Sequence, residues 1–162
     1  MIKDVSGDIL LSGAQVIAHG VAPGDHFDAG LALSLRQEWP ALAKDFRHHC
    51  HTAHPKAGEA WVWGTIDGKR IVSLFTQDPV DGERGAGRPG RAHVEHINHA
   101  LRALRNLADK EKFTSLALPR LGTGVGGLTW EQVKPIIHRN LGELSIPVYV
   151  YATFRKGEKA AE

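Results

Sequence analysis

A glycine-rich stretch in the second half of the chain constrains the fold more than any other part of the sequence. It begins with Leu116, Leu118 and Leu121, whose apolar side chains and flanking turn formers predict a short buried strand. Four glycines then follow within residues 122–127. Because glycine adopts positive φ and lets a ligand approach the backbone closely, this stretch predicts a strand followed by a tight loop.

A helix start follows the glycines. Thr129 and Gln132 have capping-box spacing, and a helical pattern runs from Trp130 to Leu141. The free N–H groups at a helix start, together with the positive end of its dipole, favour anions. We therefore expect a phosphate or diphosphate at residues 122–127, with a tight connection that binds no ligand as the alternative.

A second loop of the same kind lies in the first third of the chain. Residues 16–20 predict a buried strand, and a loop rich in Gly, Pro and Asp follows at 21–30. The next segment has a helical pattern, with Asp28 as a candidate N-cap. Because both loops follow strands and precede helices, we expect them at one edge of a sheet, where one ligand touches both.

The rest of the chain predicts further strands and helices in alternation. The expected elements are an edge strand at 2–5, a helix at 41–51, a hairpin at 60–77, an exposed mobile loop at 78–90, a helix at 92–108 and a strand at 147–154. This order favours a layered α/β domain with a mixed sheet. We expect a single domain over residues 1–154 and a charged, frayed tail over 155–162.

Charge and cysteine usage exclude several classes of protein. The formal charge of +2 is too small to indicate nucleic-acid binding from charge alone. Cys50 is the single cysteine, so no internal disulfide is possible and a cytoplasmic location is the simplest expectation. No apolar run approaches the ~20 residues that span a bilayer, so no membrane partner is predicted.

Two common nucleotide-binding motifs are missing from the glycine-rich loops. No G-x-G-x-x-G follows the first strand, which argues against a Rossmann dinucleotide site. Gly127 is followed by Leu128 and Thr129 rather than by the Lys-Ser/Thr of a P-loop. A kinase or NTPase is therefore not predicted, although two anion-binding loops on one edge suit a diphosphate between two larger groups.

Four segments in this order resemble the macrodomain family, whose members bind ADP-ribose. They are Gly7-Asp8-Ile9, Val16-Ile-Ala-His19, Ala29-Gly30-Leu31-Ala32 and the run from Pro119 to Trp130. The resemblance covers nearly the whole chain and implies a three-layer α/β/α fold with a mixed central sheet. The chain looks most like the branch that includes terminal ADP-ribose glycohydrolases and antitoxins that remove ADP-ribose from DNA.

The resemblance implies a role for each matching residue. Asp8 would accept a hydrogen bond from the adenine amino group, with Ile9 beside it; a local turn cap is the alternative for Asp8. The loop from Ala22 to Gly30 would wrap the distal ribose, with Ala29, Gly30 and Leu31 among the binding residues. His19 would lie nearby, although a core histidine is the default reading of His19. The diphosphate would lie against the backbone of Leu121, Gly122, Thr123, Gly124, Val125, Gly126 and Gly127.

Three positions depart from the family pattern. Relatives that use a lysine nucleophile carry it at the end of the second hairpin strand, where this chain has Gln77. Glutamine cannot form a Schiff base with an opened ribose, so the lysine mechanism is excluded. The position of the partner aspartate is Gly126, and Asp28 stands where a glycine is usual. Asp28 would either disturb ribose binding or supply a carboxylate near the anomeric carbon.

Two reactions remain compatible with these residues. One is hydrolysis of an ADP-ribosyl adduct, with Asp25, Asp28 or His26 as general base for a water. The other is removal of phosphate from ADP-ribose 1″-phosphate, with Gln77 orienting water or substrate. A non-catalytic ADP-ribose reader is the third alternative. We expect a mono-ADP-ribosyl hydrolase whose partner is ADP-ribose or an ADP-ribosylated macromolecule, with nucleic acid entering only as such a substrate.

Histidine-rich segments do not predict a metal site. Residues 48–51 and His54 form a dense cluster, but no second half-site such as C-x-x-C accompanies it. His93, His96 and His99 share the helix predicted at 92–108, and this spacing does not bring three ring nitrogens together. We therefore predict neither a metal ion nor a cofactor.

Overall fold

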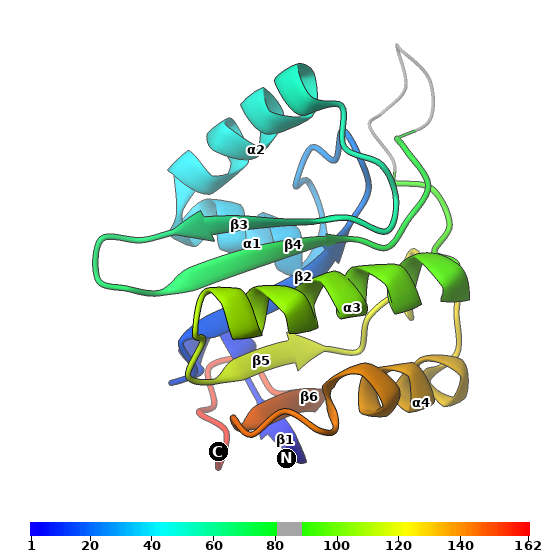
Figure 1. Cartoon of the computed structure of the whole chain (residues 1–162). Helices are drawn as coiled ribbons and strands as arrows, with labels where there is room; N and C mark the ends of the chain where they lie inside the picture. The colour runs from blue at the N-terminus through cyan, green and yellow to red at the C-terminus, as the bar shows by residue number, and fades with distance from the viewer. Residues whose placement is uncertain (81–88) are drawn as a thin grey trace.

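Six strands form one mixed sheet in the order β1-β6-β5-β2-β4-β3 in the computed structural model, which describes residues 1–80 and 89–162 (Figure 1). All neighbouring strands are parallel except the β3–β4 hairpin. The strands are β1 (Ile2–Gly7), β2 (Val16–Val21), β3 (Ala60–Gly64), β4 (Arg70–Phe75), β5 (Leu116–Pro119) and β6 (Val148–Phe154). The predicted mixed sheet is confirmed.

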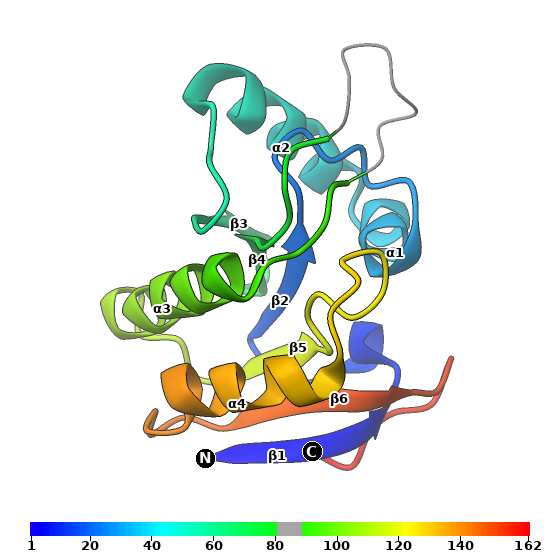
Figure 2. The same cartoon turned by 90° about the vertical axis from the view of Figure 1, so that its right-hand side faces the viewer.

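Helices cover both faces of this sheet (Figure 2). On one face lie α1 (Gly30–Glu38) and α2 (Pro40–Ala53), and on the other lie α3 (Val94–Lys110) and α4 (Trp130–Leu141). A short 3₁₀ turn, η1 (Ile9–Leu11), follows β1. The predicted three-layer α/β/α fold is therefore confirmed. None of the helices in the described ranges has the length and apolar character that a membrane crossing requires.

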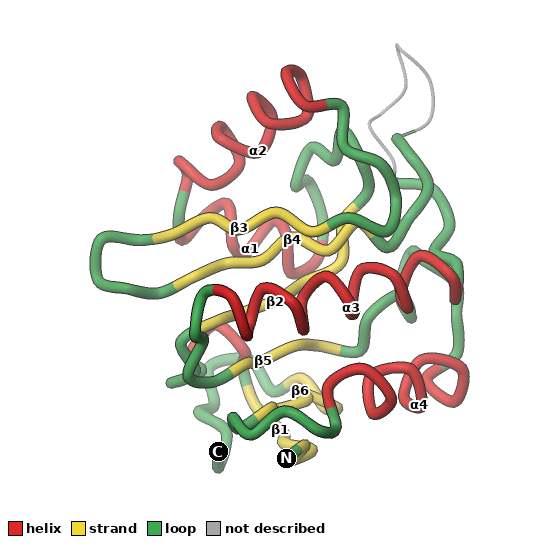
Figure 3. Tube along the Cα trace, viewed as in Figure 1, coloured by secondary structure: helices red, strands yellow, loops and turns green. Residues whose placement is uncertain are grey.

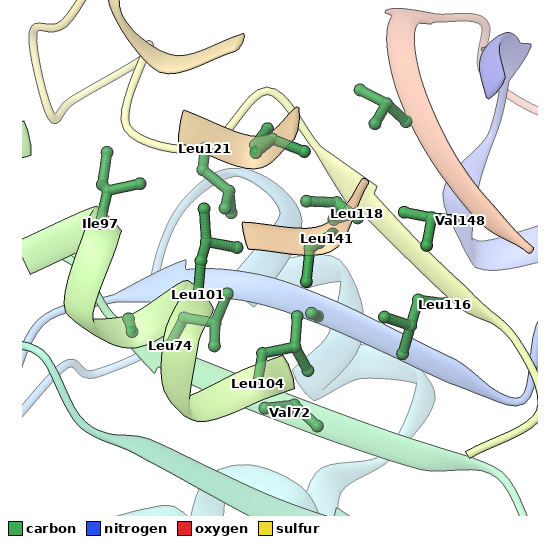
Figure 4. Close-up of a cluster of buried hydrophobic side chains, with 14 of the residues drawn as sticks. Val72, Leu74, Ile97, Leu101, Leu104, Leu116, Leu118, Leu121, Leu141 and Val148 are labelled. Atoms are coloured by element: carbon green, nitrogen blue, oxygen red, sulfur yellow. The ribbon is translucent and has the colours of Figure 1, made fainter. Parts of the chain in front are cut away.

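Alternation along the parallel strands divides the core into two halves. In β2, Val16 and Ala18 belong to the cluster under α3 and α4, whereas Ile17 and Val21 belong to the cluster under α1 and α2. The first cluster contains the fully buried Leu101 of α3 and is shown in Figure 4. Strands buried on both faces explain why these segments read as continuous apolar runs.

The carboxyl ends of the central strands carry the two loops for which the sequence predicts a ligand. The loop after β2 leads to α1, and the glycine-rich loop after β5 leads to α4 (Figure 3). Figure 2 looks onto this end, where the loop after β5 lies beside α1. The predicted placement of both loops at one edge follows from their positions after two adjacent parallel strands.

Two local expectations were wrong, and one lies partly outside the description. Ala29, not Asp28, is the N-cap of α1, and no side chain caps this helix. The tail at 155–162 does not fray but packs against the N-terminal part of the chain. The predicted mobile loop at 78–90 includes residues 81–88, which lie outside the described residues.

Hydrogen bonds from the two cap residues of η1 and from β6 hold the tail in place. The amide of Gly157 donates to Asp8 Oδ2 at 3.0 Å, and the hydroxyl groups of Ser12 and Tyr151 donate to Glu162 Oε2 at 2.5 and 2.6 Å. Ala160 is buried in the core under α1 and α2. The charged composition of the tail predicted exposure to solvent. Its hydrogen-bond partners Asp8 and Ser12 lie at the other end of the sequence, so no local pattern in the tail could indicate these contacts.

His19 is the one histidine in the described ranges that the sheet buries completely. It lies near the end of β2, its Nε2 is 3.1 Å from Ser73 Oγ, and its ring meets the edge of Phe27. Burial lowers the pKa of His19 to about 3. The imidazole is therefore neutral at physiological pH, and folding opposes its protonation.

Truncation of Leu101 tests the core under α3. Leu101→Ala is expected to reduce the free energy of unfolding by about 2–5 kcal/mol, because a fully buried leucine leaves a cavity when it is shortened. Urea denaturation measures the loss. Leu11→Ala, at a leucine that is 45% exposed, is the control and should cost less than about 1 kcal/mol. Equal losses in both variants would contradict the packing described.

Burial of neutral His19 predicts a stability loss in acid. In the unfolded chain the imidazole has its ordinary pKa of 6.5, so between this value and about 3 only the unfolded state binds the proton. Linkage then removes about 2 kcal/mol of the wild-type free energy of unfolding between pH 7 and pH 5. Urea denaturation at both pH values measures this loss in the wild type and in His19→Gln, whose glutamine does not titrate. The wild type should lose about 2 kcal/mol more than the variant between pH 7 and pH 5. Identical pH dependences would show that His19 is not buried in the neutral form.

Candidate functional site

Two adjoining cavities lie at the carboxyl edge of the sheet and form one groove. The first has a volume of about 340 Å³, and the second about 510 Å³. They share the lining residues Gly30, Leu31 and Pro119, which come from the start of α1 and the end of β5. The groove is therefore bounded by both loops that the sequence singled out.

The glycine-rich loop presents unpaired backbone amides to the first cavity. Within residues 1–80 and 89–162, the amides of residues 123–126 have no hydrogen-bond acceptor. Only at its far end does the loop close on itself, where Gly127 N–H donates to Gly124 and Leu128 N–H donates to Gly122. Successive free N–H groups of this kind form a concave anion-binding site.

Close packing against the start of α3 fixes the shape of this loop. Gly122 has a φ of +71°, and a Cβ there would lie 2.9 Å from Ile97 Cδ1. A Cβ on Gly126 would lie 2.6 Å from the carbonyl oxygen of Gly122 and 2.7 Å from Ala92 Cβ. The carbonyl of Gly126 accepts the amide of Ala92 at 3.0 Å. Glycine is therefore required at both positions by conformation or by space.

The start of α1 lines the same cavity with a second set of free amides. The N-cap Ala29 supplies no side-chain hydrogen bond, and the amides of residues 30–32 find no acceptor in the described chain. The helix dipole adds partial positive charge at this point. Two sets of free N–H groups thus line one cavity, which suits a diphosphate better than a single phosphate.

Two carboxylates from the first loop also line this cavity, and they differ in burial and in hydrogen bonding. Asp25 accepts the amides of Ala22 at 3.2 Å and Phe27 at 2.9 Å, one on each oxygen, and burial raises its pKa. Asp28 is 56% exposed at its side chain, and its Oδ1 accepts Arg36 Nη1 at 2.9 Å. Its Oδ2 lies 3.8 Å from His26 Nδ1 and accepts no hydrogen bond from the described residues. Asp28 therefore retains a carboxylate oxygen that can accept a proton.

Gln77 and His19 lie at the base of the first cavity. Gln77 is 7% exposed, and its amide Nε2 donates to the carbonyl of Gly90 at 3.0 Å. His19 Nδ1 is buried without a hydrogen-bond partner in the described part of the chain. A buried unpaired nitrogen is costly, so His19 can gain from a polar ligand group placed beside it.

The second cavity has the features of a site for a flat base. Asp8 and Ile9 line it together with Tyr151, and Phe154 is 67% exposed at its rim. Asp8 caps η1 through Leu10 N–H at 3.1 Å and also accepts the amide of Gly157. The cap role left open for Asp8 is therefore present, and its carboxylate retains lone pairs for a further donor.

Most predicted site residues meet in this groove, but three do not line it. Thr123 and Gly127 belong to the glycine loop, where the Thr123 hydroxyl donates to the carbonyl of Arg120. His26 instead lines a smaller cavity with Arg47 and Cys50. The predicted residues that line the groove are Asp8, Ile9, His19, Asp25, Asp28, Ala29, Gly30, Leu31, Gln77, Leu121, Gly122, Gly124, Val125 and Gly126.

Sequence reasoning missed several lining residues. Pro119 and Arg120 precede the glycines directly, so adjacency was a usable signal for them. Tyr151 and Lys156 come from β6 and the tail, and they reach the second cavity only because β6 pairs with both β1 and β5. Their place in the site depends on strand order, which no local pattern in the sequence encodes.

Comparison with known proteins assigns the chain to a family. The model of the Macro domain matches residues 28–137. Among curated proteins, a DNA ADP-ribosyl transferase-DNA ADP-ribosyl glycohydrolase fusion protein of Thermosipho africanus is 29% identical over 94% of this chain and 42% of its own length. The DNA ADP-ribosyl glycohydrolase of Thermus aquaticus is 25% identical over 93% of this chain and 41% of its own length. The chain thus spans about two-fifths of the length of these relatives.

Solved structures share the same fold. The macrodomain of Thermus aquaticus DarG superimposes with a TM-score of 0.81 at 24% identity, covering 94% of this chain and 98% of that one. Thermosipho africanus DarTG in complex with ADP-ribose also gives 0.81, at 23% identity over 98% of this chain and 42% of that one. At these identities the superpositions establish the fold, and with the family match they show that this chain belongs to the macrodomain family.

Proposed function

We propose that this macrodomain binds ADP-ribose in the groove and hydrolyses ADP-ribosyl adducts, with ADP-ribosylated DNA as its substrate class. The observation that carries the proposal is the pair of free amide sets, at residues 124–126 and 30–32, lining one cavity. A diphosphate placed there would accept hydrogen bonds from both sides. The curated relatives named DNA ADP-ribosyl glycohydrolases support the choice of substrate.

The two cavities suggest how ADP-ribose would lie. Adenine would occupy the second cavity, with its amino group donating to Asp8 and its ring beside Phe154. The distal ribose would occupy the inner part of the first cavity, near His19 and Asp28. Pro119, shared by both cavities, would lie under the link between the two halves.

Asp28 is the carboxylate that we assign as general base. It lines the first cavity and keeps Oδ2 available, whereas both oxygens of Asp25 accept loop amides. A water that loses its proton to Asp28 would attack the anomeric carbon as the bond between that carbon and the nucleobase breaks. The base would leave with the bonding electron pair and take a proton from solvent. The Arg36 guanidinium, 2.9 Å from Asp28 Oδ1, would hold this carboxylate in place.

Gln77 favours the alternative of a reader without activity. Its side chain is buried and donates to Gly90, and it offers no nucleophile. No lysine lines the first cavity among the described residues. A reader would bind ADP-ribose and leave the adduct intact, so binding and turnover need separate tests.

Gly124→Val tests the diphosphate position. No atom lies within 4 Å of a Cβ built on Gly124, and its φ is not in the left-handed region, so the fold tolerates the side chain. The side chain would nevertheless occupy the amide-lined cavity. We expect calorimetry with ADP-ribose to show binding by the wild type and at least about tenfold weaker binding by the variant, equivalent to about 1.4 kcal/mol.

Gly13→Ala is the matched control, because its nearest neighbour lies at 3.5 Å and it is remote from both cavities. This variant should bind ADP-ribose as the wild type does. Thermal melting should show both variants folded. Undiminished binding by a folded Gly124→Val protein would place the diphosphate elsewhere.

Asp28→Asn tests the assigned base. Release of ADP-ribose from a mono-ADP-ribosylated DNA oligonucleotide should slow by about 10²–10⁴-fold, the usual range for loss of a general base. Binding of free ADP-ribose should change much less, because backbone amides rather than the Asp28 carboxylate are expected to bind the diphosphate. Glu38→Gln, which neutralises an exposed carboxylate at the other end of α1, should leave turnover unchanged.

The outcomes separate the three functions. Turnover by the wild type that Asp28→Asn retains in full would remove Asp28 as the base. ADP-ribose binding without release from DNA would identify a reader. Phosphate release from ADP-ribose 1″-phosphate, with no release from DNA, would identify the phosphatase alternative.

A further inference from the structure

Two histidines and an aspartate converge outside the groove, near the start of α3. Asp78 follows β4, and His93 and His96 lie at the N-cap and in the first turn of α3. His93 Nε2 lies 2.8 Å from Asp78 Oδ2, and His96 Nε2 lies 3.3 Å from Asp78 Oδ1. None of the three lines either cavity of the groove.

The backbone holds these three residues in place independently of their side chains. The Asp78 amide donates to Arg91 at 2.8 Å, and the Asp78 carbonyl accepts Gly90 at 3.1 Å. The His93 amide donates to the carbonyl of Thr76 at 3.4 Å. A Cβ on Gly90 would lie 2.7 Å from Asp78 Cβ, so the glycine permits this close approach. Donors fixed in this way lose little entropy when they bind a ligand.

The donor atoms suit a transition-metal ion. They are two imidazole Nε2 atoms and a carboxylate oxygen, all within 4.8 Å of one another, and no other group of three His, Cys, Asp or Glu residues in the described ranges is so arranged. Zinc takes such ligands at about 2.0–2.2 Å, with a water in the remaining tetrahedral position. The two rings approach edge to face at 5.0 Å, and both direct Nε2 at the same carboxylate.

Hydrogen bonding alone gives this arrangement little stability. The side chains of Asp78 and His93 are 47% and 44% exposed, and exposed ion pairs contribute only about 0–1 kcal/mol. A metal ion would replace these weak contacts with three coordinate bonds.

We propose that Asp78, His93 and His96 form a binding site for a divalent transition-metal ion, with zinc as the preferred ion and water as the fourth ligand. The metal would tie the segment after β4 to the first turn of α3. Ala92, next to His93, donates to Gly126 of the glycine loop, so the same turn supports the groove. The site is structural and does not depend on the proposed hydrolysis.

Zinc titration of the chelator-treated full chain at pH 7.5, against a chromophoric competitor, tests the site. The wild type should bind one equivalent with micromolar or tighter affinity. Loss of a residue that only supports a metal ligand weakens metal binding by about 10- to 100-fold. His93→Ala and His96→Ala each remove a ligand itself, so each should weaken zinc binding by more than this. Zinc should also raise the melting temperature of the wild type and not that of either variant.

A double variant, His48→Ala with His51→Ala, is the matched control because it removes two histidines from the other histidine cluster, at residues 48–54. It should bind zinc as the wild type does. Thermal melting without zinc should show all the variants folded. Absence of micromolar binding by the wild type, or binding that survives His96→Ala and disappears in the double variant, would overturn the proposal.

Discussion

The shape of the candidate groove depends on one contact, the packing of the glycine loop against the start of α3. Gly126 accepts the amide of Ala92, and a side chain at Gly122 or Gly126 would collide with α3 or with the loop itself. One side of the loop thus packs against the start of α3, while its backbone amides have no hydrogen-bond acceptor among the described residues. Since β5 and β2 are adjacent and parallel, the same edge of the sheet brings the start of α1 to the opposite wall.

Charge in the groove is balanced rather than uniformly positive. Free amides from two elements favour an anion, whereas Asp25 and Asp28 at the inner end would repel one. Arg36 neutralises Asp28, and the amides of Ala22 and Phe27 bind Asp25. Such a division would place phosphates against the amides and leave the carboxylates beside a neutral sugar, which is the separation that hydrolysis at an anomeric carbon requires.

The sequence predicted those parts of the structure that local chemistry determines. The helix at Trp130–Leu141 was predicted with its observed bounds, because Thr129 and Gln132 form the capping box that their spacing indicated. Family resemblance added Asp8 and Ile9, which line the second cavity. The roles assigned to the site residues stay predictions until ligand binding is measured.

Other features were out of reach because they depend on contacts between distant segments. Asp28 is a residue type that often caps helices, but its carboxylate pairs with Arg36, eight residues further along the chain, and Ala29 takes the cap position. The tail is ordered by Ser12 and Tyr151, which lie in separate elements. Helical spacing argued against a metal site at His93 and His96, since it could not show that Asp78 lies between them.

The central claim is that one ligand spans both cavities, and amide chemical shifts in a nitrogen-15-labelled sample test it most directly. On titration with ADP-ribose, the signals of residues 123–126 and of Asp8 and Ile9 should shift together along one saturation curve. AMP should shift the second group more than the first. If ADP-ribose perturbs only one group, or neither, the two cavities do not form the continuous site described here.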